Sequence, residues 1–205
     1  MKFASYQDFI HYLDSLGVFS MQLGLSRMET AINRLDLLPS PSLIIHVVGT
    51  NGKGSTSGYL EALARAHGLK TGLYTSPHLV SVRERIRVAN KLLSEERFLE
   101  AANIVMGQCA DIGLTYFELL TIMAMVIFGG ESVECIILEA GLGGTHDATC
   151  AIPADFTVVT PIGMDHEQIL GATLLDIARD KAGALGRCPA LSGIQEPGVL
   201  KLLTE

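Results

Sequence analysis

The sequence predicts an α/β protein with a mostly parallel sheet flanked by helices. Short runs rich in β-branched residues alternate along the chain with longer helical patterns, as in successive βαβ units. The run Leu43–Val48 is continuous and apolar, which is typical of a parallel strand buried on both faces. A glycine-rich turn and a helical pattern follow this run, as in folds that hold a phosphate group at the start of a helix.

The composition is that of one compact globular domain, or at most two small ones. The chain has 205 residues, of which 48% are hydrophobic and 18% charged. The net charge of -7 argues against a broad nucleic-acid-binding surface. The mean hydropathy of +0.35 is high, but the longest apolar stretch, residues 119–128, is far shorter than the ~20 residues that a membrane-spanning helix needs.

The first residues and the cysteines predict a cytoplasmic protein. Asp8, His11 and Asp14 interrupt the apolar pattern of residues 1–17, so this segment is not a secretory signal. No CxxC pair and no metal-ligand spacing connects the four cysteines, which are Cys109, Cys135, Cys150 and Cys188. Reduced thiols that pack in the core are therefore expected.

Capping and breaking residues place the elements of the first half. Ser5 caps a first helix with Asp8 as its capping-box partner, and Gly17 ends it. Further along we expect a helix over residues 26–38, the strand Leu43–Val48, a helix over residues 55–67 and a strand over residues 69–75. The charges that crowd residues 83–87, Arg85 among them, predict a segment on the surface.

The second half continues the alternation. Ser94 opens a helix with two acids in its first turn, where the helix dipole favours them. Thr115 and Glu118 form a capping box before residues 119–128, the most apolar helix of the chain. The remaining elements are strands at residues 135–138 and 156–159, a helix capped by Thr173 and Asp176 that ends near Gly183, a weak strand at residues 189–192 and a short final helix.

The glycine-rich turn after the first strand is the sharpest motif. It departs from the G-x-x-x-x-G-K-[ST] pattern because Val47 stands where the first glycine belongs and Gly54 separates Lys53 from Ser55. The turn can still bind phosphate despite this difference. Its glycines let backbone N–H groups approach phosphate oxygens, Lys53 adds a positive charge, and Ser55 or Thr56 could reach Mg²⁺. The alternative is an ordinary glycine-rich turn with an exposed lysine.

Polar side chains follow three other strands at the same edge of the predicted sheet. Glu139 ends one strand, His166 follows another, and Ser76 begins a third polar cluster. Taken alone, each has an ordinary explanation: Glu139 would be an exposed carboxylate at a strand end, His166 a structural histidine, and Ser76 part of a turn. Lys181, alone, is a solvated helix lysine. Together with the glycine-rich turn, the three strand ends describe a site for a nucleotide and Mg²⁺.

Seven motifs in a fixed order give the chain a family resemblance. They are HVVGTNGKGS, YTSPHL, ERIRV, LTYFE, LEAGLGGTHDAT, GMDH and ARDKAG, and the resemblance around them runs over about residues 23–183. In this order they resemble bacterial folylpolyglutamate synthase/dihydrofolate synthase, a branch of the Mur-type ATP-dependent amide ligases. GTNGK alone is shared by the wider superfamily, whereas TSPHL, TYFE and EAGLGG are typical of the folate branch.

The resemblance implies a P-loop NTPase-like fold, that of the Mur ligase central domain, over residues 1–205. It implies an ATP-binding loop of Gly49, Thr50, Asn51, Gly52, Lys53, Gly54 and Ser55. It implies Mg²⁺ ligands at Ser76, Glu139 and His166, with Lys181 as a further ligand when carbamylated; Lys53, His166 and Lys181 would be catalytic. The implied substrate-binding residues are Leu23, Gly24, Thr115, Tyr116, Phe117, Glu118, His146, Asp147 and Ala148.

The implied reaction is carboxylate activation. ATP phosphorylates the carboxylate of dihydropteroate or a folate, the amine of L-glutamate attacks the acyl phosphate, and ADP and phosphate leave. The partners implied are these small molecules, without nucleic acid or membrane, and the expected state is a monomer.

The chain departs from the family in two ways. Thr145 and His146 stand where Arg and Leu are usual, and Cys150 stands where Asn is usual. Loss of that Arg is expected to affect the affinity or the orientation of the acidic substrate. Family members also carry a C-terminal α/β domain that binds glutamate. That domain is expected to be absent here, so weak nucleotide binding and little ligase activity are expected of this chain alone. The alternatives are another Mur-type ligase, or a nucleotide-binding module without ligase activity.

Overall fold

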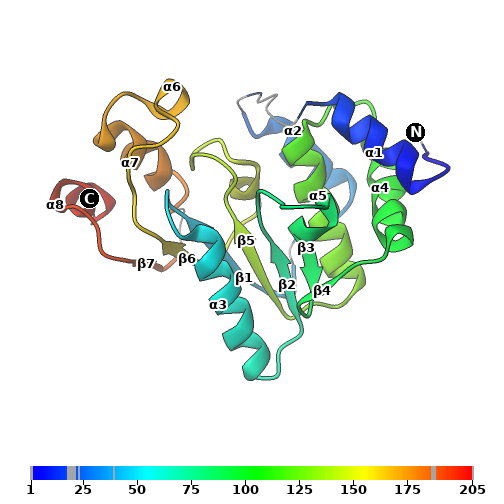
Figure 1. Cartoon of the computed structure of the whole chain (residues 1–205), viewed down its shortest axis with the longest axis horizontal. Coiled ribbons are helices and arrows are strands. Elements are labelled where there is room, and N and C mark those ends of the chain that lie inside the picture. The colour runs from blue at the N-terminus through cyan, green and yellow to red at the C-terminus, as the bar shows by residue number, and fades with distance from the viewer. Residues whose placement is uncertain (1, 18–21, 23, 39, 186–187, 205) are drawn as a thin grey trace.

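The structure is a computed structural model that describes residues 2–17, 22, 24–38, 40–185 and 188–204 (Figure 1). The described strands form one seven-stranded sheet of order β4-β3-β2-β5-β1-β6-β7. The parallel strands are β1 (Leu43–Val48), β2 (Thr71–Tyr74), β5 (Cys135–Glu139), β6 (Phe156–Val159) and β7 (Ala190–Ser192), and the antiparallel ones are β3 (Ile86–Val88) and β4 (Lys91–Leu92). The predicted fold class is confirmed.

Helices cover both faces of this sheet. Their bounds are α1 (Tyr6–Ser15), α2 (Ser26–Arg34), α3 (Lys53–Ala66), α4 (Glu95–Cys109), α5 (Tyr116–Gly130), α6 (Glu167–Leu170), α7 (Leu174–Ala182) and α8 (Pro197–Thr204), with 3-10 turns η1 (Val82–Arg85) and η2 (Ala148–Ala151). The predicted capping boxes of Ser5 with Asp8 and of Thr115 with Glu118 are both confirmed. Because such caps depend on residues three apart, local sequence suffices to predict them.

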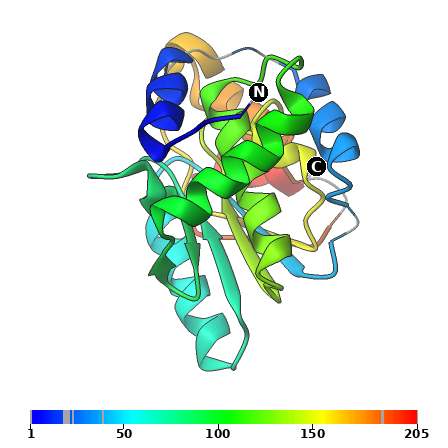
Figure 2. The same cartoon turned by 90° about the vertical axis from the view of Figure 1, so that its right-hand side faces the viewer.

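Alternation along the central strands divides the core between the two faces. Ile136 and Leu138 of β5 pack in the large cluster with α4 and α5, whereas Cys135 and Ile137 face the smaller cluster with α3. Figure 2 shows α3 and α5 on opposite sides of the strands. A third cluster joins the ends of β1 and β6 to α7 and α8. The sheet is thus buried on both faces, as the apolar strand runs predict.

The segment after β2 differs most from expectation. Residues 83–87 were expected on the surface, but Arg85 is buried, with 4% of its surface exposed. The reason is a β-hairpin: β3 pairs antiparallel with β2, and its Ile86 and Val88 enter the core. Positive φ angles at Ala89 and Asn90 form the tight turn to β4.

Element ends differ by a few residues. The helix predicted over residues 26–38 ends at Arg34, and the strand predicted over residues 69–75 spans Thr71–Tyr74. The helix predicted from residue 55 begins at Lys53, which brings the lysine into its first turn. In the part of the chain that the structure describes, no helix is both long and apolar enough to cross a membrane.

Candidate functional site

The parallel strands end together at one edge of the sheet. The register aligns Val47 of β1 with Glu139 of β5, and Val48 of β1 with Val159 of β6. Tyr74 of β2 lies beside Leu138 of β5. The loops that follow these strands therefore leave the sheet side by side, at the top of Figure 1. This edge is where open α/β sheets bind their ligands.

The glycine turn, residues 49–55, connects β1 to α3. Gly49 has φ 139°, and a Cβ there would lie 2.1 Å from Thr160 Oγ1, so only glycine fits. Gly52 is the N-cap of α3, and the first turn of α3 carries no acid, so the positive end of its dipole remains available to an anion. Lys53 Nζ lies 3.3 Å from the Thr50 carbonyl, beside this end.

Two amides of the glycine turn are already in use. The N–H groups of Thr50 and Asn51 both donate to the Pro161 carbonyl, at 3.1 Å each. Thr50 Oγ1 also accepts a hydrogen bond from the Gly163 N–H at 3.1 Å. The sequence predicts that the whole turn binds phosphate. In the structure, only the amides from Gly52 onward remain available to an anion.

Glu139 is a buried carboxylate at the end of β5, with 3% of its surface exposed. Its Oε2 accepts a hydrogen bond from the Ser76 N–H at 3.1 Å, so these two predicted ligands do meet. A Cβ at Gly54 would lie 3.6 Å from either Glu139 oxygen, which places the carboxylate against the start of α3. Burial raises the pKa of Glu139, while the Ser76 hydrogen bond and the Lys53 charge oppose the rise. The alternative interpretation of Glu139, an exposed carboxylate at a strand end, is therefore wrong.

Lys181 is buried in α7, with 4% of its surface exposed, and is not the solvated lysine its position alone suggests. Burial and then the charge of Lys53 lower the pKa of Lys181 to about 8. The glycine run after β5 packs directly on this helix, because a Cβ at Gly144 would lie 2.6 Å from Lys181 Cα. Lys53 and Lys181 therefore share one region above the sheet.

His166 forms no described hydrogen bond or ion pair with the other predicted ligands. It is the N-cap of α6 in a left-handed conformation, and its side chain is 49% exposed. Its Nε2 is 3.5 Å from Asp165 Oδ2, and no described hydrogen bond or ion pair joins it to Glu139 or Ser76. Among the residues with described positions, no group of three or more His, Cys, Asp or Glu side chains could hold a metal ion. The predicted ligand set contains only two such residues.

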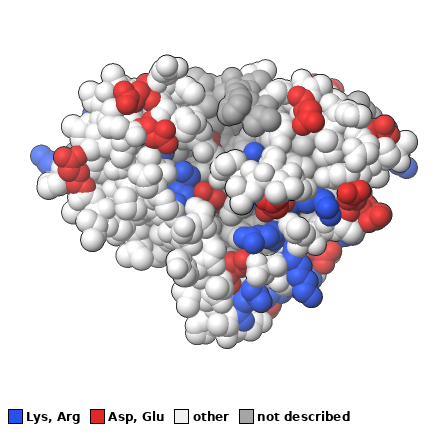
Figure 3. All heavy atoms as spheres, viewed as in Figure 1, with Lys and Arg blue, Asp and Glu red and all other residues white. Residues whose placement is uncertain are grey.

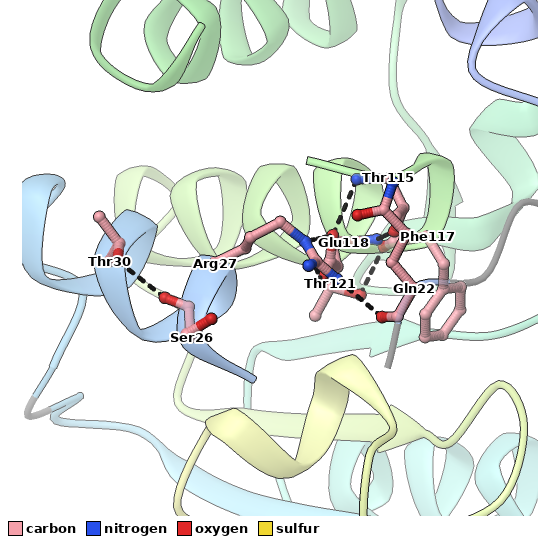
Figure 4. Close-up of polar contacts among 8 residues, drawn as sticks. All are labelled: Gln22, Ser26, Arg27, Thr30, Thr115, Phe117, Glu118 and Thr121. Atoms are coloured by element: carbon pink, nitrogen blue, oxygen red, sulfur yellow. Dashed lines mark hydrogen bonds and ion pairs between the residues drawn. The ribbon is translucent and has the colours of Figure 1, made fainter. Parts of the chain in front are cut away.

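On the predicted substrate side, Glu118 ties α5 to the N-terminal segment. Its carboxylate receives the Thr115 N–H at 2.8 Å and the guanidinium of Arg27, with Nη2 at 2.9 Å from Oε1. Figure 4 shows the same Arg27 group reaching the Gln22 carbonyl, at 2.7 Å. Glu118 thus holds this segment, which includes Gly24. Leu23 lies outside the described residues.

Two aromatic residues follow at the start of α5. Phe117 lies beside Tyr74, with ring centroids 5.5 Å apart. Tyr116 is buried, and the guanidinium of Arg85 lies 5.3 Å above its ring. Both rings therefore lie near the end of β2, toward Ser76.

Arg85 is the residue that sequence reasoning missed. Its Nε donates to His78 Nδ1 at 2.9 Å, and in the described part of the chain no carboxylate pairs with it. Its charge opposes the rise in the pKa of Glu139 that burial causes, and burial together with this charge lowers the pKa of His78. Among the described residues no hydrogen bond uses its two Nη groups, which are the groups that could bind an anion. The motif ERIRV contains Arg85, but its burial depends on a hairpin that the charge run conceals.

Asp147 braces the loop after the glycine run. Its Oδ2 accepts from the Leu142 N–H at 2.8 Å, and its Oδ1 accepts from the Thr149 N–H at 3.0 Å and hydroxyl at 2.5 Å. His46 of β1 contacts the same hydroxyl from below. Ala148 is buried in η2 and His146 is exposed. The Asp147 carboxylate thus shapes the loop.

Basic and acidic side chains are interspersed on the face drawn in Figure 3. A smaller number of them, mostly acidic, lie over α6, α7 and α8, and many gather over β2, β3 and β4. The clustered arginines of this region include Arg83 and Arg97, which pair with Glu95 and Glu131. Surface charge here is therefore largely balanced by neighbours.

Comparison with known proteins gives a consistent answer, although no family model matches the chain. The chain is 41% identical over 175 residues to the dihydrofolate synthase/folylpolyglutamate synthase of Buchnera aphidicola subsp. Acyrthosiphon pisum, covering 85% of this chain and 42% of that protein. E. coli FolC in complex with DHPP and ADP has a TM-score of 0.91 and 38% identity, over 98% of this chain and 48% of that chain. The bifunctional enzyme of Yersinia pestis, complexed with AMPPNP and Mn, has a TM-score of 0.88 and 36% identity, over 98% and 49%.

The chain thus spans less than half the length of these relatives. Over that span it shares both their sequence and their fold, with the glycine turn, Glu139 and Lys181 all inside the aligned fold. The chain belongs to the dihydrofolate synthase/folylpolyglutamate synthase family.

Proposed function

We propose that residues 1–205 are the ATP-binding domain of a ligase that joins L-glutamate to dihydropteroate, to folates, or to both. The observation that carries the proposal is the meeting of Lys53, Glu139, Ser76 and Lys181 at the carboxyl edge of the sheet, beside a helix start that lacks acids. The relatives solved with ADP and with AMPPNP and Mn support it. A cytoplasmic location, where ATP is present and thiols stay reduced, is part of the proposal and agrees with four free cysteines.

The glycine turn would bind the phosphates of the nucleotide. The N–H groups from Gly52 onward point from the start of α3, and Lys53 supplies a charge next to them. Such groups stabilise the negative charge that spreads over a phosphoryl group during transfer.

A divalent cation fits the residues at this edge. Glu139 is buried and forms no described ion pair, so its charge lacks a partner that a cation would supply. Ser76, Glu139, His166 and a carbamylated Lys181 would hold Mg²⁺, which neutralises phosphate charge when bound. His166 would have to turn inward from its exposed position to take part.

The substrate would lie between the start of α5 and Glu139. Phe117 and Tyr116 offer aromatic surface, and Asp147 shapes the loop on the other side. Arg85 lies over the Tyr116 ring, and its charge acts on Glu139, one of the proposed cation ligands. We assign Arg85 the role of binding the carboxylate to be activated, since a guanidinium suits it in geometry and charge.

Binding of nucleotide and release of ADP are separate measurements that test the proposal. Titration of this chain with a fluorescent ADP analogue and Mg²⁺ should give saturable binding, and Lys53→Ala should weaken it by about tenfold or more through loss of a charged hydrogen bond. Lys91→Ala, an exposed lysine on β4, is the matched control. ADP release that requires ATP, dihydropteroate and L-glutamate together would establish ligase activity. Binding without such release identifies a nucleotide-binding module.

A further inference from the structure

We infer that Gln195 is a positioning residue that holds the glycine turn in its binding conformation. It acts through residues 160–163, the loop that follows β6. The role in nucleotide binding rests on the proposed function, whereas the structural coupling does not.

The side-chain amide of Gln195 pairs with the loop as a backbone amide would. Its Nε2 donates to the Thr160 carbonyl at 3.1 Å, and its Oε1 accepts from the Ile162 N–H at 3.0 Å. The last backbone bond between β6 and β7 is that of the Gly193 N–H to the Val159 carbonyl, at 2.8 Å. Gln195 therefore extends the ladder past the end of both strands. Ser192 Oγ, at 3.2 Å from Nε2, fixes the amide.

The other side of the loop holds the glycine turn. The Pro161 carbonyl accepts from the N–H groups of Thr50 and Asn51, and Gly163 exchanges hydrogen bonds with Thr50 Oγ1, at 3.1 Å in each case. Thr160 also donates its N–H to the Val48 carbonyl at 2.8 Å and lies tightly against Gly49.

The two sets of contacts alternate along the loop. Residues 160 and 162 bond to Gln195, whereas residues 161 and 163 bond to the glycine turn. The loop thus behaves as a short strand clamped between the two. Thr160 and Ile162 are buried in the intact chain, so their backbone groups take their hydrogen bonds from Gln195 and not from solvent. Without Gln195, the loop keeps its bonds to β1 and the glycine turn but loses its support on the other side, so the acceptor of the Thr50 and Asn51 amides is held less firmly.

The test compares Gln195→Ala and Gln195→Glu with the unaltered chain. Gln195→Glu keeps the size and one acceptor but loses the N–H donors and sets a carboxylate against the Thr160 carbonyl. Amide hydrogen exchange of Thr50 and Asn51, followed by NMR without nucleotide, should quicken by roughly tenfold in both variants. The affinity for the fluorescent ADP analogue with Mg²⁺ should fall several-fold. Exchange of the Ile137 amide in β5 should stay unchanged.

Gln7→Ala is the matched control, because Gln7 is exposed on α1, across the molecule from α8 (Figure 1). It should change neither measurement. Wild-type exchange at Thr50 and Asn51 in both Gln195 variants would overturn the inference, as would a lower melting temperature with those two amides unaffected. If Gln195→Ala fails to fold, the isosteric Gln195→Glu decides. Faster exchange in a chain that binds no nucleotide would refute the proposed function and leave the coupling established.

Discussion

His46 Nε2 and Thr149 Oγ1 lie 2.5 Å apart, and this contact joins the central strand β1 to the loop that Asp147 braces. The Thr149 hydroxyl donates its single hydrogen to Asp147 Oδ1, so the hydrogen between His46 and Thr149 belongs to His46. Burial lowers the pKa of His46, which keeps the ring neutral with its proton on Nε2. A relay of two hydrogen bonds therefore runs from a buried strand to the proposed substrate side.

Replacing the bridging hydroxyl should loosen both ends of this relay. Thr149→Val keeps the shape of the side chain but leaves His46 and Asp147 each short of a partner in a buried place. The free energy of unfolding should fall by about 1–3 kcal/mol, the usual cost of a buried unsatisfied polar group. Urea denaturation measures this, with Thr149→Ser as the control that keeps the hydroxyl. Equal stability of the valine and serine variants would contradict the relay.

The same histidine predicts how stability depends on pH. The pKa of His46 is lowered in the folded chain from the ordinary 6.5, so below that pH the unfolded chain binds more protons than the folded one. Stability should therefore fall as pH falls through about 6.5. His46→Gln, which can still donate to Thr149, should flatten this part of the curve. The lowered pKa of His78 contributes in the same direction and the raised pKa of Glu139 in the opposite one. The informative quantity is therefore the difference between the two proteins, and parallel curves would refute the assignment.

Lys181 should carry a carbamate in the presence of CO2. A neutral amine adds CO2 to form the carbamate and releases a proton, and a pKa of about 8 makes the neutral amine of Lys181 abundant in mildly alkaline solution. Carbon-13 NMR with labelled bicarbonate should show a carbamate signal of Lys181, separate from that of the α-amino group, that grows as pH rises through 8 and disappears in Lys181→Met.

Lys53 supplies a control on that signal. Its positive charge helps to lower the pKa of Lys181, so Lys53→Gln should raise the pKa and weaken the carbamate signal at a fixed pH. Persistence of that signal in Lys181→Met, or its absence from the unaltered chain, would remove the proposed metal role of this lysine.

The features that the sequence predicts correctly are those set by residues close together in the chain or by the order of strands and helices. The capping residues Ser5 and Thr115 act on neighbours three positions away, and the strand Leu43–Val48 is apolar except for His46. The glycine turn, Ser76 and Glu139 come together because parallel strands end at one edge, which the order of elements predicts.

Long-range packing explains what could not be predicted. Arg85 is buried because β3 folds back on β2, and its charged neighbours in sequence conceal that pairing. Lys181 is buried by a glycine run almost forty positions earlier in the chain. The amides of Thr50 and Asn51 bond to Pro161, a contact that no motif records. In each case the partner lies far away in sequence, and residue type alone does not reveal it.

Replacing Arg85 should weaken substrate binding without lowering the stability of the fold. Burying a charge is costly, and among the described residues no carboxylate offsets that cost for Arg85, so an apolar side chain of similar size should be tolerated in its place. Arg85→Met should therefore unfold at the same or a higher urea concentration than the unaltered chain, although His78 loses a donor.

If Arg85 binds the substrate carboxylate, the same variant should bind dihydropteroate about tenfold to a hundredfold more weakly, as expected for a hydrogen bond to a charged group. Calorimetric titration measures that affinity, with Arg87→Met, the half-buried neighbour that bonds Asn90, as the matched control. A strongly destabilised Arg85→Met that keeps its affinity would make this arginine a structural residue, because the loss would then lie in the hairpin and not in the site.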